Sequence, residues 1–150
     1  MKRDSRLSGV LHVLLHMAEA GEPMTSEALA KAMRTNPVVV RRNMGPLRNA
    51  GLVAAGRGHG GGWVIAAPLA SITMRDIYEA LGSPEPFAMG NRSESPGCLV
   101  EQAVNAALAE AFRDAEQLLL DRFGAVTLDR LARDFHRRMK AHGGTHDHAM

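Results

Sequence analysis

Two signals for the start of a helix follow each other closely in this chain, and they limit its fold more than any other feature. Thr25 can accept a hydrogen bond from the free amides of a first helical turn, which predicts a helix that ends at about Met33. Asn36 and Pro37 repeat the signal, because asparagine caps helices well and proline fits the first helical position. This second helix is predicted to end at about Asn49, and its candidate inward positions are Val39, Val40, Met44 and Leu47. We therefore expect two short helices joined by a tight turn.

A glycine-rich segment follows the second helix and separates two short runs that favour strands. The runs are residues 52–55 and 63–66, and five of the seven residues 56–62 between them are glycine. Two such runs around a glycine-rich turn predict a β-hairpin. Because glycine has no side chain, the backbone at the tip can approach another molecule closely.

The rest of the chain is predicted to be helical apart from one loop and the C-terminal end. Apolar residues recur at steps of three and four over residues 7–20 and 99–123, which is typical of amphipathic helices. Thr73 and Thr127 can each cap a further helix. Residues 82–97 are rich in proline, glycine, serine and asparagine and predict a loop. The expected fold class is mostly α with one small β-hairpin.

Basic residues are concentrated in the part of the chain that holds the two short helices and the hairpin. Six cations and no acidic residue lie between Ala28 and Met74, so this segment carries a charge of +6. The remaining residues carry a charge of −4, since the whole chain has a net charge of +2. A basic block in an otherwise acidic chain indicates a polyanionic partner. A solvated basic surface without a partner is the alternative.

Two short helices followed by a hairpin form the order of a winged helix-turn-helix, whose second helix enters the major groove of DNA. The N-terminal half of that helix offers side chains and amides to bases and phosphates. An arginine at the hairpin tip, the wing, can reach a neighbouring minor groove. We therefore expect contacts with double-stranded DNA from residues of the two short helices and the wing, namely Thr25, Ser26, Asn36, Pro37, Val38, Arg41, Arg42, Arg57, His59 and Gly60.

Four stretches of the sequence match a known pattern: LRNAGLV at 47–53, RGHGGGW at 57–63, ITMRDI at 72–77, and Cys98-Leu99 before the long helix. Together they resemble the Rrf-two family of bacterial winged-helix regulators, which includes the iron–sulfur cluster regulator IscR and the nitric-oxide sensor NsrR. The resemblance covers about residues 7–131. It implies a homodimer whose long C-terminal helices cross and place two DNA-binding domains on a palindromic operator.

The apolar stripe of the long helix fits this implied dimer, because a helix of that length with no large domain to cover it needs a partner surface. Burial against the chain's own first helix is the alternative. We expect a winged helix-turn-helix domain over residues 1–82, a hinge loop over 83–97, dimerisation helices over 98–140 and a disordered tail over 141–150. The expected dimer contacts are Val100, Val104, Leu108, Phe112 and Leu119.

The resemblance also implies a sensor near the start of the long helix, where family members usually carry a cluster or a reactive thiol. Members similar to IscR have three cysteines there, whereas this chain has Cys98 alone, so a three-cysteine cluster is excluded. His12 and His16 lie one helical turn apart, a spacing that suits a metal. The resemblance implies that this first helix lies near the partner's cluster loop in the dimer. With Cys98, and with Glu101 as a further ligand, the two histidines could therefore hold a [2Fe–2S] cluster or a transition metal. Ordinary packing at an interface is the alternative for both histidines.

Cys98 itself has several open interpretations. At the start of a helix its thiol would be reactive, because the helix dipole lowers a thiol pKa. It could instead form a disulfide with a second subunit, bind metal, or lie buried as a small apolar residue. In the tail, His142, His146 and His148 could bind a metal weakly, but disorder is the simpler interpretation because ordering a tail costs entropy.

The sequence as a whole predicts a transcriptional regulator, with repression as the expected activity and redox state or a metal as the expected signal. A winged-helix adaptor that binds proteins rather than DNA is the alternative, since fold does not fix function. An enzyme is not expected, because no nucleophile–base pattern or phosphate loop is present. A cytoplasmic protein is expected, since no apolar run is long enough to span a membrane and the N-terminus does not resemble a signal peptide.

Overall fold

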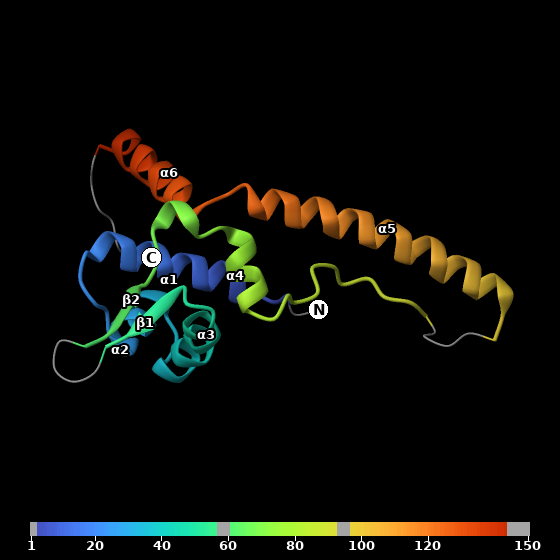
Figure 1. Ribbon diagram of the computed structural model, residues 1–150, viewed down its shortest axis with the longest axis horizontal. Coiled ribbons are helices and arrows are strands. Elements are labelled where there is room, and N and C mark those ends of the chain that lie inside the picture. Colours follow the sequence, from blue (N-terminus) through green and yellow to red (C-terminus); the bar gives the residue numbers. More distant parts are fainter. Residues whose placement is uncertain (1–2, 57–60, 93–96, 144–150) are drawn as a thin grey trace.

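The computed structural model describes residues 3–56, 61–92 and 97–143 (Figure 1). Its helices and its single hairpin confirm the expected fold class, mostly α with one small two-stranded sheet. The elements in chain order are α1 (Arg6–Ala20), α2 (Ser26–Met33), α3 (Pro37–Asn49), β1 (Val53–Ala55), β2 (Trp63–Ile65), the short 3₁₀ helix η1 (Leu69–Ser71), α4 (Met74–Ala80), α5 (Leu99–Gly124) and α6 (Leu128–Ala141).

Four of the helices begin at the capping residues that the sequence predicted. The side chains of Thr25 and Asn36 accept hydrogen bonds of 3.0 and 3.1 Å from backbone N–H groups three residues later. Thr73 and Thr127 act in the same way, at 3.0 and 3.1 Å. Each cap satisfies an amide that the first helical turn would otherwise leave unpaired. Local sequence therefore fixes where α2, α3, α4 and α6 start.

The turn between α2 and α3 has a conformation that the sequence did not predict. Arg34 adopts a φ of +54°, in the left-handed region that favours glycine. Its backbone N–H reaches the carbonyl groups of Ala30 and Lys31, which closes the last turn of α2. Because the chain reverses within three residues, α3 packs directly against α2.

The hairpin is attached to the helices through its second strand. β1 and β2 are antiparallel, with Val53 opposite Ile65 and Ala55 opposite Trp63. Met24, in the segment before α2, adds two backbone hydrogen bonds to Trp63, of 2.8 and 3.1 Å. The indole Nε1 of Trp63 donates to Ser26 Oγ at 2.9 Å. These bonds hold the base of the wing against the start of α2.

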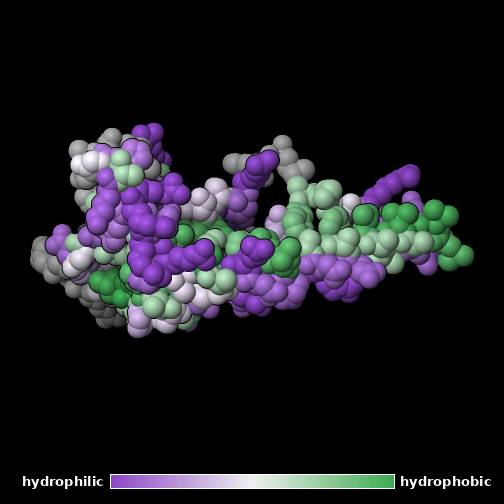
Figure 2. All heavy atoms as spheres, turned by 90° about the horizontal axis from the view of Figure 1, so that it is seen from above, coloured by the Kyte–Doolittle hydropathy of each residue, from purple (hydrophilic) through white to green (hydrophobic). Residues whose placement is uncertain are grey.

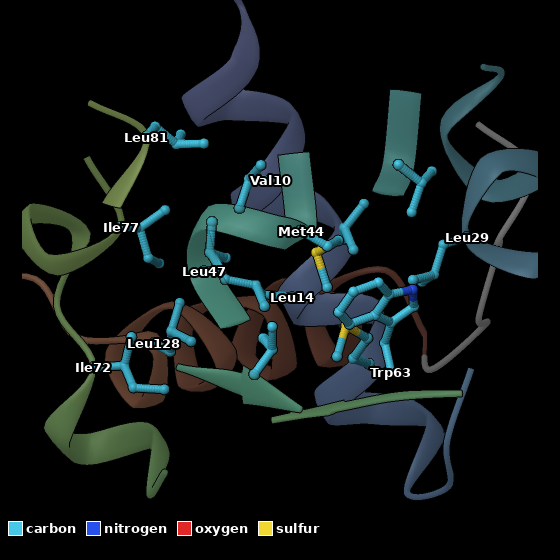
Figure 3. Close-up of a cluster of buried hydrophobic side chains, with 14 of the residues drawn as sticks. Val10, Leu14, Leu29, Met44, Leu47, Trp63, Ile72, Ile77, Leu81 and Leu128 are labelled. Atoms are coloured by element: carbon cyan, nitrogen blue, oxygen red, sulfur yellow. The ribbon is translucent and has the colours of Figure 1, made fainter. Parts of the chain in front are cut away.

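A single apolar core joins most of these elements. α1 lies at its centre and contacts α2, α3, α4, α6 and β2. In Figure 1, α2, α3 and the hairpin lie on one side of α1 and α6 lies on the other. The side chains that meet in the core (Figure 3) include Val10, Leu14, Leu29, Met44, Leu47, Trp63, Ile72, Ile77, Leu81 and Leu128.

α6 packs on this core rather than on α5. Leu128, at its start, is fully buried, and the Leu128 backbone N–H donates to the carbonyl of Ile72 at 2.9 Å. Further along, His136 Nε2 and Glu19 Oε1 of α1 are 2.7 Å apart. The sequence grouped α6 with α5 in residues 98–140, but the two helices pack against different parts of the chain. We call residues 3–82 together with α6 the head.

α5 leaves the head and runs away from it (Figure 1). None of its 26 described residues is buried. At its C-terminal end, next to the head, it contacts α4, and Phe123 meets Tyr78 edge-on with ring centroids 5.6 Å apart. Further out, Phe112 stacks on Phe87 of the preceding loop at 6.0 Å. The helix is thus attached to its own chain along one side only.

Candidate nucleic-acid interface

α3 has one face in the core and one face in solvent. Val40, Met44 and Leu47 are buried, as three of the four inward positions that the sequence predicted. Arg41 and Arg42 are exposed on the outer side, as are the capping residue Asn36 and Arg48. The helix continues through Pro46 to Asn49 without interruption. The outer face is therefore basic and solvent-exposed.

Arg41 has one acidic neighbour. Its Nη1 lies 3.8 Å from Oε1 of Glu27 in the first turn of α2, and both side chains are more than half exposed. An exposed ion pair of this length stabilises the fold little. Arg41 can therefore exchange this carboxylate for another anion at small cost.

Thr25 and Ser26 each have a structural role within the chain. The sequence predicted the role of Thr25 but not that of Ser26. The Thr25 hydroxyl caps α2, as predicted, whereas the Ser26 hydroxyl accepts the hydrogen bond from Trp63. Each hydroxyl accepts within the chain and keeps its own proton to donate. The signal for the second contact is the lone tryptophan of the chain, because a buried indole N–H needs an acceptor. Their contacts with DNA stay predictions.

The wing residues Arg57, His59 and Gly60 lie outside the described residues, so their contacts with DNA also stay predictions. The two strands at the base of the wing are described as far as Gly56 and from Gly61 onward. Gly56 N donates to Gly62 O at 2.8 Å, which continues the hairpin pairing toward the tip. α3 and the hairpin lie on the same side of the head (Figure 1).

His12 and His16 form a close pair on α1. Their Nε2 atoms are 2.9 Å apart, and their rings are stacked with centroids 4.7 Å apart. Two bonds of about 2.0–2.1 Å to one ion would span such a distance at nearly a right angle. Within the described parts of the chain, however, no group of three or more His, Cys, Asp or Glu side chains can hold a metal ion. A single chain therefore does not bring Cys98 to the two histidines.

Cys98 is exposed at the N-cap of α5, so its own chain does not bury it as an apolar residue. The backbone N–H groups of Glu101 and Val100 lower the pKa of its thiol, because they stabilise the thiolate. This agrees with the reactive thiol that a helix start predicts.

The apolar stripe of α5 is open to solvent in the single chain. Val100 is 71% exposed, Val104 50% and Leu108 37%. Figure 2 shows apolar side chains gathered along the part of the molecule that extends beyond the head. Phe112 and Leu119, the other two expected contacts, are half-buried, and Phe112 has its own partner in Phe87. The alternative that α1 buries the stripe is wrong.

None of the described helices is both long enough and apolar enough to cross a bilayer.

Comparisons with known proteins agree with these features. The Rrf2 family model, which is described as an iron-dependent transcriptional regulator, matches residues 3–134. YwnA of Bacillus subtilis, named as an HTH-type transcriptional regulator, is 28% identical over 125 residues, which cover 83% of this chain and 92% of YwnA. Both matches are to regulators and not to enzymes.

Solved structures show the same fold. CymR, the global cysteine regulator of Bacillus subtilis, superposes with a TM-score of 0.61 at 27% identity and covers 89% of this chain and 97% of its own. IscR of T. potens has a TM-score of 0.65 over 89% of this chain and 88% of its own, but at 16% identity it shows a likeness of fold alone. The chain belongs to the Rrf2 family of transcriptional regulators and has a DNA-binding winged-helix fold.

Proposed function

We propose that this protein represses transcription by binding a palindromic operator as a homodimer. The observation that carries the proposal is the outer face of α3, where Arg41 and Arg42 stand exposed and side by side. Adjacent helical residues project about 100° apart, so one guanidinium can bind a guanine edge while the other binds a phosphate. Asn36 and Pro37 bring the N-terminal amides of α3 to the same surface.

The wing and the start of α2 extend this surface. Arg57, His59 and Gly60 would reach a neighbouring minor groove, and the hydroxyls of Thr25 and Ser26 would donate to phosphates. The hydrogen bond from Trp63 to Ser26 supports this arrangement, because it holds the wing base and the start of α2 in one fixed relation.

The open stripe of α5 supports the homodimer. Val100, Val104 and Leu108 expose apolar area that a second copy of the helix would cover, and a twofold arrangement would bring the same patch of both chains together. Phe112 and Leu119 would line the side of that contact nearest to the loop. In this proposal the head binds DNA, residues 83–97 form the hinge, and α5 joins the two chains.

The signal would act at the start of α5. Cys98 is the one cysteine of the chain, and its thiolate is stabilised and exposed, as a redox-responsive group requires. The alternative signal is a [2Fe–2S] cluster or a transition metal held by His12, His16 and the Cys98 of a second subunit. The i, i+4 placement of the two histidines on α1 supports that alternative, and anaerobic purification with metal analysis and a visible absorption spectrum would test it.

Operator binding tests the main proposal. DNA that the protein enriches from a random library is measured by fluorescence anisotropy against competitor DNA, at several salt concentrations. Arg41→Ala or Arg42→Ala should weaken specific binding roughly tenfold or more, as the loss of a base or phosphate contact predicts. Affinity should fall steeply with salt, because phosphate contacts release counterions.

The matched control is Arg133→Ala, because Arg133 pairs with Asp129 on α6, on the opposite side of the head. It should bind the operator as the unchanged protein does. Unchanged affinity in both α3 variants would exclude α3 as the recognition helix. A protein that enriches no sequence over competitor DNA would favour the adaptor alternative.

A further inference from the structure

Val38 is an unusual residue for the surface on which it lies. Its side chain is 56% exposed at the N-terminal end of α3. Every other exposed large apolar side chain among the described residues lies on α5 or, as Met89, in the loop before it. Nothing in the core of the head needs a valine at this position, so its apolar surface is available to a partner.

Val38 shares one helical face with the two arginines. Val38, Arg41, Arg42 and Gly45 follow each other at i, i+3, i+4 and i+7, which places them in one stripe along α3. Recognition helices of homeodomains use the same spacing for the side chains that reach base edges in the major groove. The stripe is therefore suited to reading bases, and its first position is apolar.

Val38 is the first side chain of the stripe. Asn36 before it accepts the 3.1 Å cap from Val39 N–H through Oδ1, so it can offer a base only the donors of its NH2 group, and Pro37 has no N–H to donate. In the major groove the thymine methyl is the apolar group that distinguishes one base pair from the others. A valine has few rotamers to lose, so it can bury that methyl at small entropic cost.

Gly45 ends the stripe without a side chain. It directly precedes Pro46 inside α3, and a proline ring crowds the Cβ of the residue before it when that residue is helical. The local chain therefore explains this glycine, and the inference depends on Val38.

We propose that Val38 packs on the methyl group of one thymine in each operator half-site. The inference rests on the proposed function, since it assigns a base contact to the same recognition helix.

Thymine-to-deoxyuridine replacement tests the role of Val38, because it removes the methyl and changes nothing else. The probe is the enriched operator with each thymine replaced in turn by deoxyuridine. The unchanged protein should lose roughly fourfold in affinity at one thymine per half-site, the effect of one unburied methyl. Val38→Ala should start with weaker binding and show no further loss at that position. The neighbouring Val39→Ala serves as the control and should keep the methyl dependence.

Three results would overturn the role of Val38. If the unchanged protein and Val38→Ala lose the same affinity at each replaced thymine, Val38 does not contact a methyl group. Operator binding, and hence the proposed function, would still stand. An enriched operator without a methyl-dependent thymine would lead to the same conclusion. Failure to enrich any sequence would reject the proposed function together with this inference. Because Val38 is exposed and alanine is the better helix former, its replacement should not lower the melting temperature, which separates a lost contact from a lost fold.

Discussion

The head and α5 of this protein differ in the burial of their apolar side chains. In the head, Leu29, Leu47, Ile77 and Leu128 are completely buried, and they come from four different helices. Along α5 none of the described residues is buried, although Val100 and Leu118 belong to a continuous apolar stripe. Burial of apolar area is the main favourable term in folding, so the head has a source of stability within one chain that α5 lacks.

This difference divides the two tasks of the molecule. A DNA-binding surface needs helices held at fixed positions, and the single core around α1 supplies them. The apolar stripe of α5 is uncovered in the single chain, and in the proposed dimer a second copy would cover it with its own stripe by symmetry. The comparison predicts that substitutions in the two regions will have separable effects, on assembly in α5 and on unfolding in the head.

The largest effect is expected from a charge placed in the stripe. Val104→Glu would bury two carboxylates in a symmetric interface, and each unpaired buried charge costs about 3–5 kcal/mol. We expect monomers in sedimentation velocity at concentrations where the unchanged protein is dimeric. Ala106→Glu is the matched control, because Ala106 is two residues further on and lies on the opposite, exposed face. Dimers that persist in Val104→Glu would exclude this stripe as the interface.

The next effect concerns the core of the head. Leu47→Ala removes a fully buried side chain of α3 and should lower the free energy of unfolding by about 2–5 kcal/mol. Denaturant unfolding monitored at Trp63 measures it. The control is Leu118→Ala in α5, a side chain 58% exposed in the single chain, tested in the monomeric Val104→Glu background. Similar losses in both variants would show that α5 is covered within its own chain.

Sequence reasoning succeeded where a structural feature depends on neighbouring residues. Thr25, Asn36, Thr73 and Thr127 cap their helices as predicted, because capping needs only a side chain and an amide three residues later. The inward face of α3 followed from helical periodicity in the same way.

Features that depend on distant residues were not predictable. Leu128 was grouped with the long helix, but it pairs with the segment before α4 through the backbone of Ile72. Ser26 was expected only to contact DNA, although it accepts from Trp63, 37 residues later. Phe112 was assigned to the dimer stripe, and nothing local indicated its stacking on Phe87. Among the candidate sites, the periodic face of α3 could be predicted. The separation of Cys98 from His12 and His16 within one chain agrees with the resemblance, which implies that the first helix lies near the cysteine loop of a partner.

A smaller effect is expected where the wing joins the head. A Cβ on Gly62 would lie 2.8 Å from the backbone carbonyl carbon and oxygen of Met24, so Gly62→Ala must push the hairpin away from α2. Overpacking of this kind costs about 1–3 kcal/mol. We expect a lower melting temperature and weaker operator binding. Gly90→Ala in the loop before α5 meets no neighbour and should change neither. A full-strength operator complex in Gly62→Ala would show that the wing position is unimportant for binding.

The smallest effect tests whether the first turn of α5 is formed without a partner. The backbone N–H groups of Glu101 and Val100 lower the pKa of the Cys98 thiol only while that turn is helical. A lowered pKa keeps the thiolate populated as the pH falls. Alkylation of native protein should therefore remain fast at pH values where alkylation of urea-unfolded protein has already slowed. Since the chain has a single cysteine, the rate reports Cys98 alone, and Cys98→Ser gives the blank.

Repeating this pH profile on the monomeric Val104→Glu variant separates the two possible origins of the shift. If α5 keeps its first turn alone, the native profile of the monomer will match that of the dimer. A monomer whose profile moves to the unfolded one would show that the partner subunit forms the turn. In that case Cys98 chemistry and dimer assembly would be coupled, because a helix start that exists only in the dimer stabilises the thiolate only there. Oxidation or alkylation of Cys98 would then shift the monomer–dimer equilibrium as well as the thiol itself.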